Sequence, residues 1–213
     1  MIKREGSPQP FGAHAEKDRA NFAVQVPKGQ KCELLLYRAG KNVPEYTFEM
    51  PEEEGIGEVR YLSVEGKNIG RYEYNYRINK KVCMDPYVKE IARKNAFGVR
   101  ENLQEHEIRG RIVTSDYDWQ NDKRLHIPWN DVTAYSLHVR GFTKHSSSKV
   151  RHKGTFLGIV EKIPYLKELG INQIQCMPVY EFEECVNGHI NYWGYGEGYY
   201  FAPKHSYAAG KSA

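Results

Sequence analysis

The second half of the chain carries a strand, helix, strand pattern that limits what it can fold into. Residues 134–139 alternate between apolar and polar side chains, which predicts a strand, and the mostly apolar segment 171–178 predicts a second strand, covered on both faces of a parallel sheet. Gly170 stands where a helix commonly ends, and Pro164 predicts a kink or two short helices. Apolar residues recur between the strands at helical spacing: Phe156, Ile159, Val160, Ile163 and Leu166. Such a β-α-β unit is right-handed in nearly all proteins.

The first half has a different periodicity. Short alternating runs bounded by Gly, Pro, Asn or Lys predict a small antiparallel β-sandwich, and they lie at 21–26, 32–39, 59–66 and 72–78. Tyr72, Tyr74 and Tyr76 share one face of their strand. We interpret these rings as a half-buried aromatic ladder, with a sugar-stacking platform as the alternative. Asp85-Pro86-Tyr87 ends the run, because proline supplies no hydrogen-bond donor to a sheet.

Charge and cysteine usage argue against several classes of protein. The formal net charge of +4 is spread along the chain, whereas nucleic-acid binding needs a concentrated basic face, and the basic run 144–153 is expected to be a solvated loop. No apolar segment follows the basic amino terminus, and no run approaches the roughly 18 apolar residues of a membrane helix. We therefore expect a cytoplasmic protein that binds neither membrane nor nucleic acid. The four cysteines lack zinc-site spacing and predict reduced thiols and no metal site: Cys32, Cys83, Cys176 and Cys185.

These patterns predict three regions. Residues 1–95 form the sandwich, residues 96–131 an irregular connector, and residues 132–213 the β-α-β region. The connector is polar apart from a few aromatic residues, which are expected to anchor it against a neighbouring surface: Tyr117, Trp119 and Trp129.

Two sets of motifs resemble known families. The sandwich, with GRYEYNYRI followed by DPYVK, is similar to the family-48 carbohydrate-binding modules that precede debranching and branching enzymes, although this region contains no Trp. The later motifs HVRGFTKH, GTFLGI, EKIPYLKELGI, GINQIQCMPV, NYWGY and FAP resemble glycoside hydrolase family 13 in their order. The match falls closest to the isoamylase and glycogen-debranching (pullulanase-like) branch. This resemblance implies an immunoglobulin-like β-sandwich followed by the first β-α-β portion of a truncated (β/α)₈ TIM barrel.

The loop at 180–200 is the predicted binding site. Active sites of TIM barrels lie on the loops after the carboxyl ends of strands, and this loop is rich in Gly and aromatic residues. The resemblance implies that Tyr195, the Tyr of WGY, stacks on the sugar in the subsite where the bond is cut. Trp193 is a second candidate for substrate binding, and the alternative is that both rings form the core of a long loop. Gly196-Glu197-Gly198 departs from the family's pattern after WGY, which leaves the substrate preference open.

No catalytic residue is assigned within the chain. Glu181, Glu183 and Glu184 are expected to be a solvated loop, and His138, with Arg140 and His145, to orient the end of the first strand rather than to perform acid-base chemistry. Residues 132–213 fall far short of the about 250 residues of a whole barrel. The resemblance implies that the catalytic carboxylates lie beyond residue 213.

The function that follows is that of an amino-terminal fragment of a glycosidase. By resemblance, the enzyme hydrolyses α-1,6 branch linkages of glycogen or related α-glucans by a retaining mechanism without an organic cofactor. The partner is an α-glucan, and the fragment alone is expected to be inactive and its second half poorly stable. The alternatives are a non-catalytic α-glucan-binding module, or a fragment of an α-1,4-acting amylase or branching enzyme.

Overall fold

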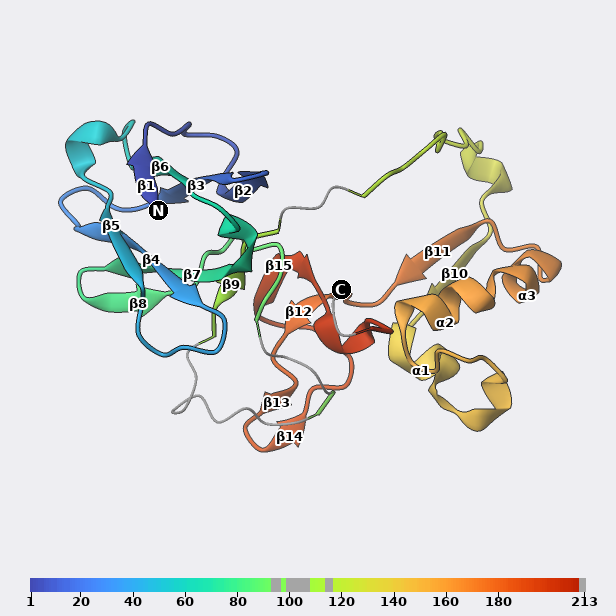
Figure 1. Cartoon of the computed structure of the whole chain (residues 1–213). Coiled ribbons are helices and arrows are strands. Elements are labelled where there is room, and N and C mark those ends of the chain that lie inside the picture. The colour runs from blue at the N-terminus through green and yellow to red at the C-terminus, as the bar shows by residue number, and fades with distance from the viewer. Residues whose placement is uncertain (93–96, 99–107, 114–116, 211–213) are drawn as a thin grey trace. The chain divides into compact units, whose positions relative to one another are not determined.

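The computed structural model describes residues 1–92, 97–98, 108–113 and 117–210 (Figure 1). The chain divides into two compact units. The first unit contains described residues 1–92, 108–113 and 199–203, and the second contains 97–98, 117–198 and 204–210. The predicted region boundary at 95 lies outside the described residues, and the three-region division stays a prediction.

Two antiparallel sheets form the first unit. The first sheet has the order β1 (Ile2–Arg4), β6 (Val59–Glu65), β3 (Arg19–Gln25) and β2 (Gly12–Glu16). The second has the order β5 (Tyr46–Glu49), β4 (Cys32–Arg38), β7 (Tyr72–Ile78) and β8 (Lys81–Cys83), with β9 (Gly110–Arg111) also paired to β7. The predicted strands are confirmed as β3, β4, β6 and β7.

One apolar core joins the two sheets into a sandwich. Buried side chains of both sheets, such as Phe22 on β3 and Leu34 on β4, belong to the same cluster. Tyr74 and Tyr76 lie in this cluster and are 1% exposed, so the aromatic ladder is structural and more deeply buried than predicted. The Tyr74 hydroxyl donates to the carboxylate of Asp85 at 2.7 Å, and burial raises the pKa of Asp85.

Strand β7 is also buried on its opposite face. Glu73 lies 3.5 Å from the guanidinium of Arg109, which in turn lies 3.7 Å over the ring of Tyr37. The side-chain amide of Asn75 donates to the carbonyl of Ile108 at 3.0 Å. Residues 108–109 therefore cover Glu73 and Asn75, which explains why these two polar side chains are buried although they lie on the face opposite the core.

The second unit contains the β-α-β unit that the sequence predicts. Strands β10 (Ala134–Leu137) and β11 (Gln173–Cys176) pair in parallel, and the connection between them contains helices α1 (Val139–Lys144), α2 (Phe156–Glu161) and α3 (Ile163–Glu168). Pro164 lies in the first turn of α3, where its missing N–H costs no helical hydrogen bond. Of the two predicted alternatives at Pro164, the structure has two short helices.

The first strand ends earlier than predicted. Strand β10 stops at Leu137, and α1 begins at Val139. The reason is a local cap: Nδ1 of His138 accepts a hydrogen bond from the Gly141 N–H at 2.9 Å, which satisfies an amide of the first turn. The prediction of a strand through Val139 is therefore wrong: His138 caps the helix, and Val139 is the first residue of that helix.

Burial also differs from the prediction at two places. All four residues of β11 are exposed, although the segment was expected to be covered on both faces. The three connector aromatics are also exposed, so the prediction that they anchor the connector is wrong: Tyr117, Trp119 and Trp129. The basic run 144–153 is mostly exposed, as expected.

The remaining elements are short. The strands are β12 (Tyr180–Phe182), β13 (Cys185–Val186), β14 (His189–Ile190) and β15 (Gly198–Pro203). The 3₁₀ turns are η1 (Glu52–Glu54), η2 (Ile69–Arg71), η3 (Trp129–Asp131), η4 (Ser146–Ser148) and η5 (His205–Tyr207). Across the described residues, no helix is both long enough and apolar enough to span a membrane.

Candidate binding site on the loop after β11

The candidate site is the part of the loop after β11 that lies in the second unit, residues 180–198, called here the aromatic loop. Strands β13 and β14 form a hairpin, and Asn187 and Gly188 occupy its turn with φ angles of 50° and 79°. Asn-Gly is the preferred pair for such a turn, because both residues tolerate positive φ. The segment from Asn191 to Tyr195 follows the hairpin directly and contains the two predicted sugar-binding residues.

The two predicted rings are exposed at the surface of this loop. Trp193 is 54% exposed and Tyr195 is 67% exposed. The edge of Trp193 meets Tyr192, with ring centroids 5.3 Å apart and ring planes at 85°. The alternative that these rings form a loop core does not fit their exposure.

His138 packs against Tyr192 and lies close to Trp193. Its imidazole stacks on Tyr192 at 4.4 Å, and its Nε2 lies 2.8 Å from the Tyr192 carbonyl and 3.2 Å from the Tyr207 hydroxyl. Since Nδ1 accepts the Gly141 N–H, Nε2 carries the proton and donates. Burial lowers the pKa of His138, so the ring is neutral near pH 7. His138 therefore joins the end of β10 to the aromatic loop, in line with the predicted orienting role.

Two glycines allow this close packing. Gly194 has φ +82°, and a Cβ there would lie 2.3 Å from the ring of Phe182. A Cβ on Gly141 would lie 2.4 Å from the Tyr192 hydroxyl. The loop therefore needs glycine at 194, whereas a side chain at 141 would displace the end of Tyr192.

The acidic residues of the loop are not the solvated group that the sequence predicts. Glu181 is 1% exposed and Glu184 is 4% exposed, and Nζ of Lys204 lies 2.6 Å and 2.5 Å from their carboxylates. The backbone N–H of His205 also donates to Glu181, at 2.9 Å. Glu183 alone is exposed. The prediction failed because the cation that compensates both carboxylates lies some twenty residues later in the chain.

These contacts bear on the chemistry of the site. Glu181 and Glu184 accept hydrogen bonds from an ammonium and from backbone or hydroxyl groups. Both side chains are buried, so neither carboxylate faces solvent, where a substrate would bind. Among the described residues, no group of three or more His, Cys, Asp and Glu side chains is placed to hold a metal ion. All four cysteines are free thiols.

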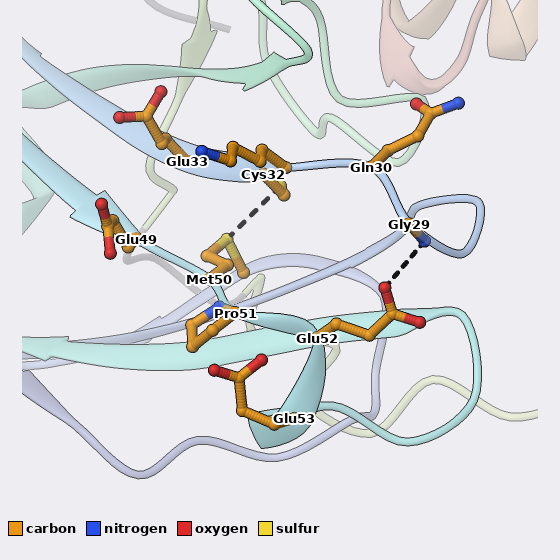
Figure 2. Close-up of a pocket in the computed structure, with 10 residues that line it drawn as sticks. Gly29, Gln30, Cys32, Glu33, Glu49, Met50, Pro51, Glu52 and Glu53 are labelled. Carbon is orange, nitrogen blue, oxygen red and sulfur yellow. Dashed lines mark hydrogen bonds between the residues drawn. The ribbon is translucent and has the colours of Figure 1, made fainter.

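The first unit contains a separate cavity of about 510 Å³ (Figure 2). Its wall includes the thiol of Cys32, 3.9 Å from the sulfur of Met50, and the carboxylate of Glu52, which accepts the Gly29 N–H at 2.7 Å. Burial raises the pKa of the Cys32 thiol to about 12, so it is neutral. None of the ten described residues that line the cavity is aromatic. The cavity lacks the flat rings that stack on sugars, so the aromatic loop is the stronger candidate for glycan binding.

Curated relatives of this chain include an isoamylase and a glycogen debranching enzyme. The chain is 34% identical over 230 residues to "Isoamylase 1, chloroplastic" of Oryza sativa subsp. japonica, covering 96% of this chain and 28% of the relative. It is 30% identical to the "Glycogen debranching enzyme" of Yersinia enterocolitica, covering 97% of this chain and 35% of the relative. This chain is a homologue of the isoamylases and glycogen debranching enzymes. The predicted family resemblance is confirmed, and the chain spans about a third of the length of these curated relatives.

Solved pullulanase structures share the fold of this debranching-enzyme homologue. The pullulanase from Bacillus acidopullulyticus matches with a TM-score of 0.73 and 27% identity, covering 93% of this chain and 25% of that one. The Anoxybacillus sp. LM18-11 pullulanase complexed with maltotetraose matches with a TM-score of 0.69 and 26% identity, covering 93% of this chain and 30% of that one. No family model matches the chain. The name of the rice relative includes "chloroplastic", and the cytoplasmic location of this homologue stays a prediction.

Proposed function

We propose that this chain supplies α-glucan contacts to a glycosidase that hydrolyses α-1,6 branch linkages in glycogen or related glucans. Tyr195 stacks on the apolar face of a glucose ring, and Trp193 extends the contact. The observation that carries the proposal is the pair of exposed rings on a glycine-bent loop at the carboxyl end of β11. An exposed ring offers a large flat surface to a sugar, and the Tyr hydroxyl keeps a hydrogen-bonding group at its edge.

Support for the substrate class comes from the relatives. A relative that is 30% identical carries the name glycogen debranching enzyme, and the Anoxybacillus pullulanase was solved with maltotetraose. Both names point to α-linked glucose chains as the shared ligand chemistry. The debranching branch accounts for these names better than an α-1,4-acting amylase does.

The 213-residue chain binds without cleaving. A retaining glycosidase needs one carboxyl group as nucleophile and a second as acid, about 5 Å apart. Glu181 and Glu184 are engaged with Lys204, and we assign them a structural role. The catalytic carboxylates of the parent enzyme then come from outside these 213 residues.

We further propose that the two units are the domains that the family resemblance implies. The parallel pair β10 and β11, joined through helices, is suited to open a (β/α)₈ barrel, because that barrel is built from repeats of this unit. The two-sheet unit is then a family-48-like, immunoglobulin-like module that precedes it.

Affinity electrophoresis in gels that contain glycogen tests the binding role. We expect Tyr195→Ala to weaken retardation by more than about fivefold, the change that corresponds to about 1 kcal/mol for a contact residue at a binding hot spot. Trp193→Ala should weaken it less, since part of that ring packs on Tyr192. Tyr117→Ala, an exposed tyrosine of the connector, is the matched control and should leave mobility unchanged.

Two results would contradict the proposal. Retardation that survives Tyr195→Ala would move glycan binding away from the aromatic loop and favour a separate glucan-binding module. Appreciable release of reducing sugar from pullulan by the purified chain would refute the claim that it binds without cleaving.

A further inference from the structure

The side chain of Asn191 lies at the base of the turn that carries both exposed rings. Its Oδ1 accepts the Gly194 N–H at 3.1 Å, and its Nδ2 donates to the carbonyls of Tyr195 at 3.2 Å and Glu183 at 3.3 Å. One side-chain amide thus holds three backbone groups. Two of them belong to the turn itself, and the third belongs to the opposite side of the aromatic loop.

The backbone of Asn191 is itself fixed. Its N–H donates to the Glu184 carbonyl at 2.8 Å, which extends the β13–β14 ladder by one rung. The carboxylate of Glu184 is held in turn by Lys204 at 2.5 Å. The amide of Asn191 therefore projects from a buried, ion-paired anchor rather than from a loose segment.

Tyr195 depends on this anchor because its own ring has little packing. At 67% exposure, the ring is not held in one direction by surrounding side chains. The position of the ring follows from its Cα–Cβ bond, whose direction is set by the backbone at Gly194 and Tyr195, the two residues that the Asn191 amide holds. A ring ordered before it binds loses less conformational entropy on binding.

We propose that Asn191 is a positioning residue for Tyr195. Its amide fixes the backbone of the turn, so that the phenol ring meets an α-glucan in one prearranged orientation. Asn191 does not touch the sugar and acts through Tyr195. The inference rests on the proposed glucan-binding function of this loop.

The test compares Asn191→Asp with a matched asparagine. Aspartate is nearly isosteric and keeps an acceptor for Gly194, but it loses both Nδ2 donors and sets a carboxylate against two carbonyls. The control is Asn172→Asp, because Asn172 also bridges two backbone groups in the second unit, the Thr133 N–H at 2.9 Å and the Asp131 carbonyl at 2.7 Å. Asn191→Ala removes all three side-chain contacts and is the second variant.

The first readout is the dissociation constant for maltotetraose and its coupling to Tyr195. We expect Asn191→Asp to raise it about 3- to 10-fold, corresponding to the cost of ordering one side chain on binding, and Asn172→Asp to leave it unchanged. In a Tyr195→Ala background, Asn191→Asp should have a clearly smaller effect, carried by the neighbouring Trp193 alone. Effects that multiply would overturn the inference, because Asn191 would then act independently of Tyr195.

The second readout needs no glucan. In a Trp119→Phe, Trp129→Phe background the indole of Trp193 is the sole Trp fluorophore, since the chain has three Trp residues. We expect Asn191→Asp and Asn191→Ala to raise acrylamide quenching of Trp193 about twofold and Asn172→Asp to leave it unchanged. If the parent chain binds no maltotetraose, the proposed function fails, and quenching alone decides whether Asn191 orders the turn. Unchanged quenching would overturn the positioning role.

Discussion

In the sandwich, the apolar faces of two sheets meet in a single buried core, whereas in the β-α-β unit many apolar side chains of α2, α3 and β11 are exposed. Phe22 and Leu34 are fully buried in the first unit, while Leu157, Val160 and Ile174 are more than one-third exposed in the second. Burial of a large apolar side chain stabilises a fold by about 1.5–3 kcal/mol. The first unit is stabilised by burial of its own apolar side chains, whereas the second unit leaves many of its apolar side chains exposed and gains less stabilisation from burial.

The second unit adds polar and aromatic contacts between distant residues to a small apolar cluster that includes Leu137, Val139 and Phe182. His138 joins the end of β10 to Tyr192 and Tyr207, and Lys204 forms ion pairs with both Glu181 and Glu184. These contacts all converge on the aromatic loop. The difference is that this unit positions its candidate site through a few buried polar groups, whereas the sandwich is held together mainly by its apolar core.

The largest expected effect comes from removing the cation that two buried carboxylates share. Lys204→Met should destabilise the second unit by about 5 kcal/mol, because breaking a buried ion pair leaves uncompensated charge. Lys3→Met is the matched control, since Lys3 pairs with Glu54 at the same 2.6 Å but both side chains are partly exposed. That pair should contribute no more than about 1 kcal/mol. Hydrogen exchange followed by mass spectrometry measures both units in one sample, and equal effects would erase the contrast between them.

A smaller effect is expected from opening a hole in the sandwich core. Phe22→Ala should lower the free energy of unfolding of the first unit by about 3–4 kcal/mol through lost burial and a residual cavity. Leu157→Ala deletes an apolar side chain of similar character that is 47% exposed, and should change the stability of the second unit by less than about 0.5 kcal/mol. Hydrogen exchange in β3 and α2 reports the two units. A loss of 2 kcal/mol or more at Leu157 would show that α2 buries more surface than the structure indicates.

The fold was predictable where its signal is local. Period-two runs identify β3, β4, β6 and β7, because successive side chains of a strand point to opposite faces and each strand turns apolar side chains toward the shared core. The break between α2 and α3 follows from Pro164 alone. The five further strands of the sandwich are short or irregular in pattern, and period-two analysis missed them.

The site was predictable in part, and the failures have one cause. Sequence analysis named Tyr195 and Trp193, and the structure places both on an exposed turn, where their sugar-binding role stays a proposal. It took Glu181 and Glu184 for solvated residues because Lys204 is remote in sequence, and it missed Asn191 because an asparagine's partners are backbone groups with no signature in the sequence. Nonlocal polar pairing, rather than propensity, decided these positions.

The smallest expected effect is a pH dependence confined to the second unit. Burial lowers the pKa of His138 in the folded chain, and the groups that face its ring are the Gly141 N–H, the Tyr192 carbonyl and the Tyr207 hydroxyl, with Arg140 adding a repulsive charge. The unfolded chain therefore takes up a proton below about pH 6.5 before the folded chain does. The contribution of His138 is fully present above that pH and is lost as pH falls toward its folded pKa, with a slope of less than about 1.4 kcal/mol per pH unit.

Urea unfolding followed by Trp emission measures this slope, since Trp119, Trp129 and Trp193 all lie in the second unit. His138→Asn is the matched variant, because asparagine also caps a helix amino terminus but does not titrate. Between pH 7.5 and 5.5 the unfolding free energy should fall more steeply in the parent chain than in His138→Asn. If the unfolding free energy fell equally with pH in both chains, the imidazole of His138 would not be held neutral in the folded chain. The contacts between β10 and the aromatic loop would then tolerate a charge that the sandwich core would not.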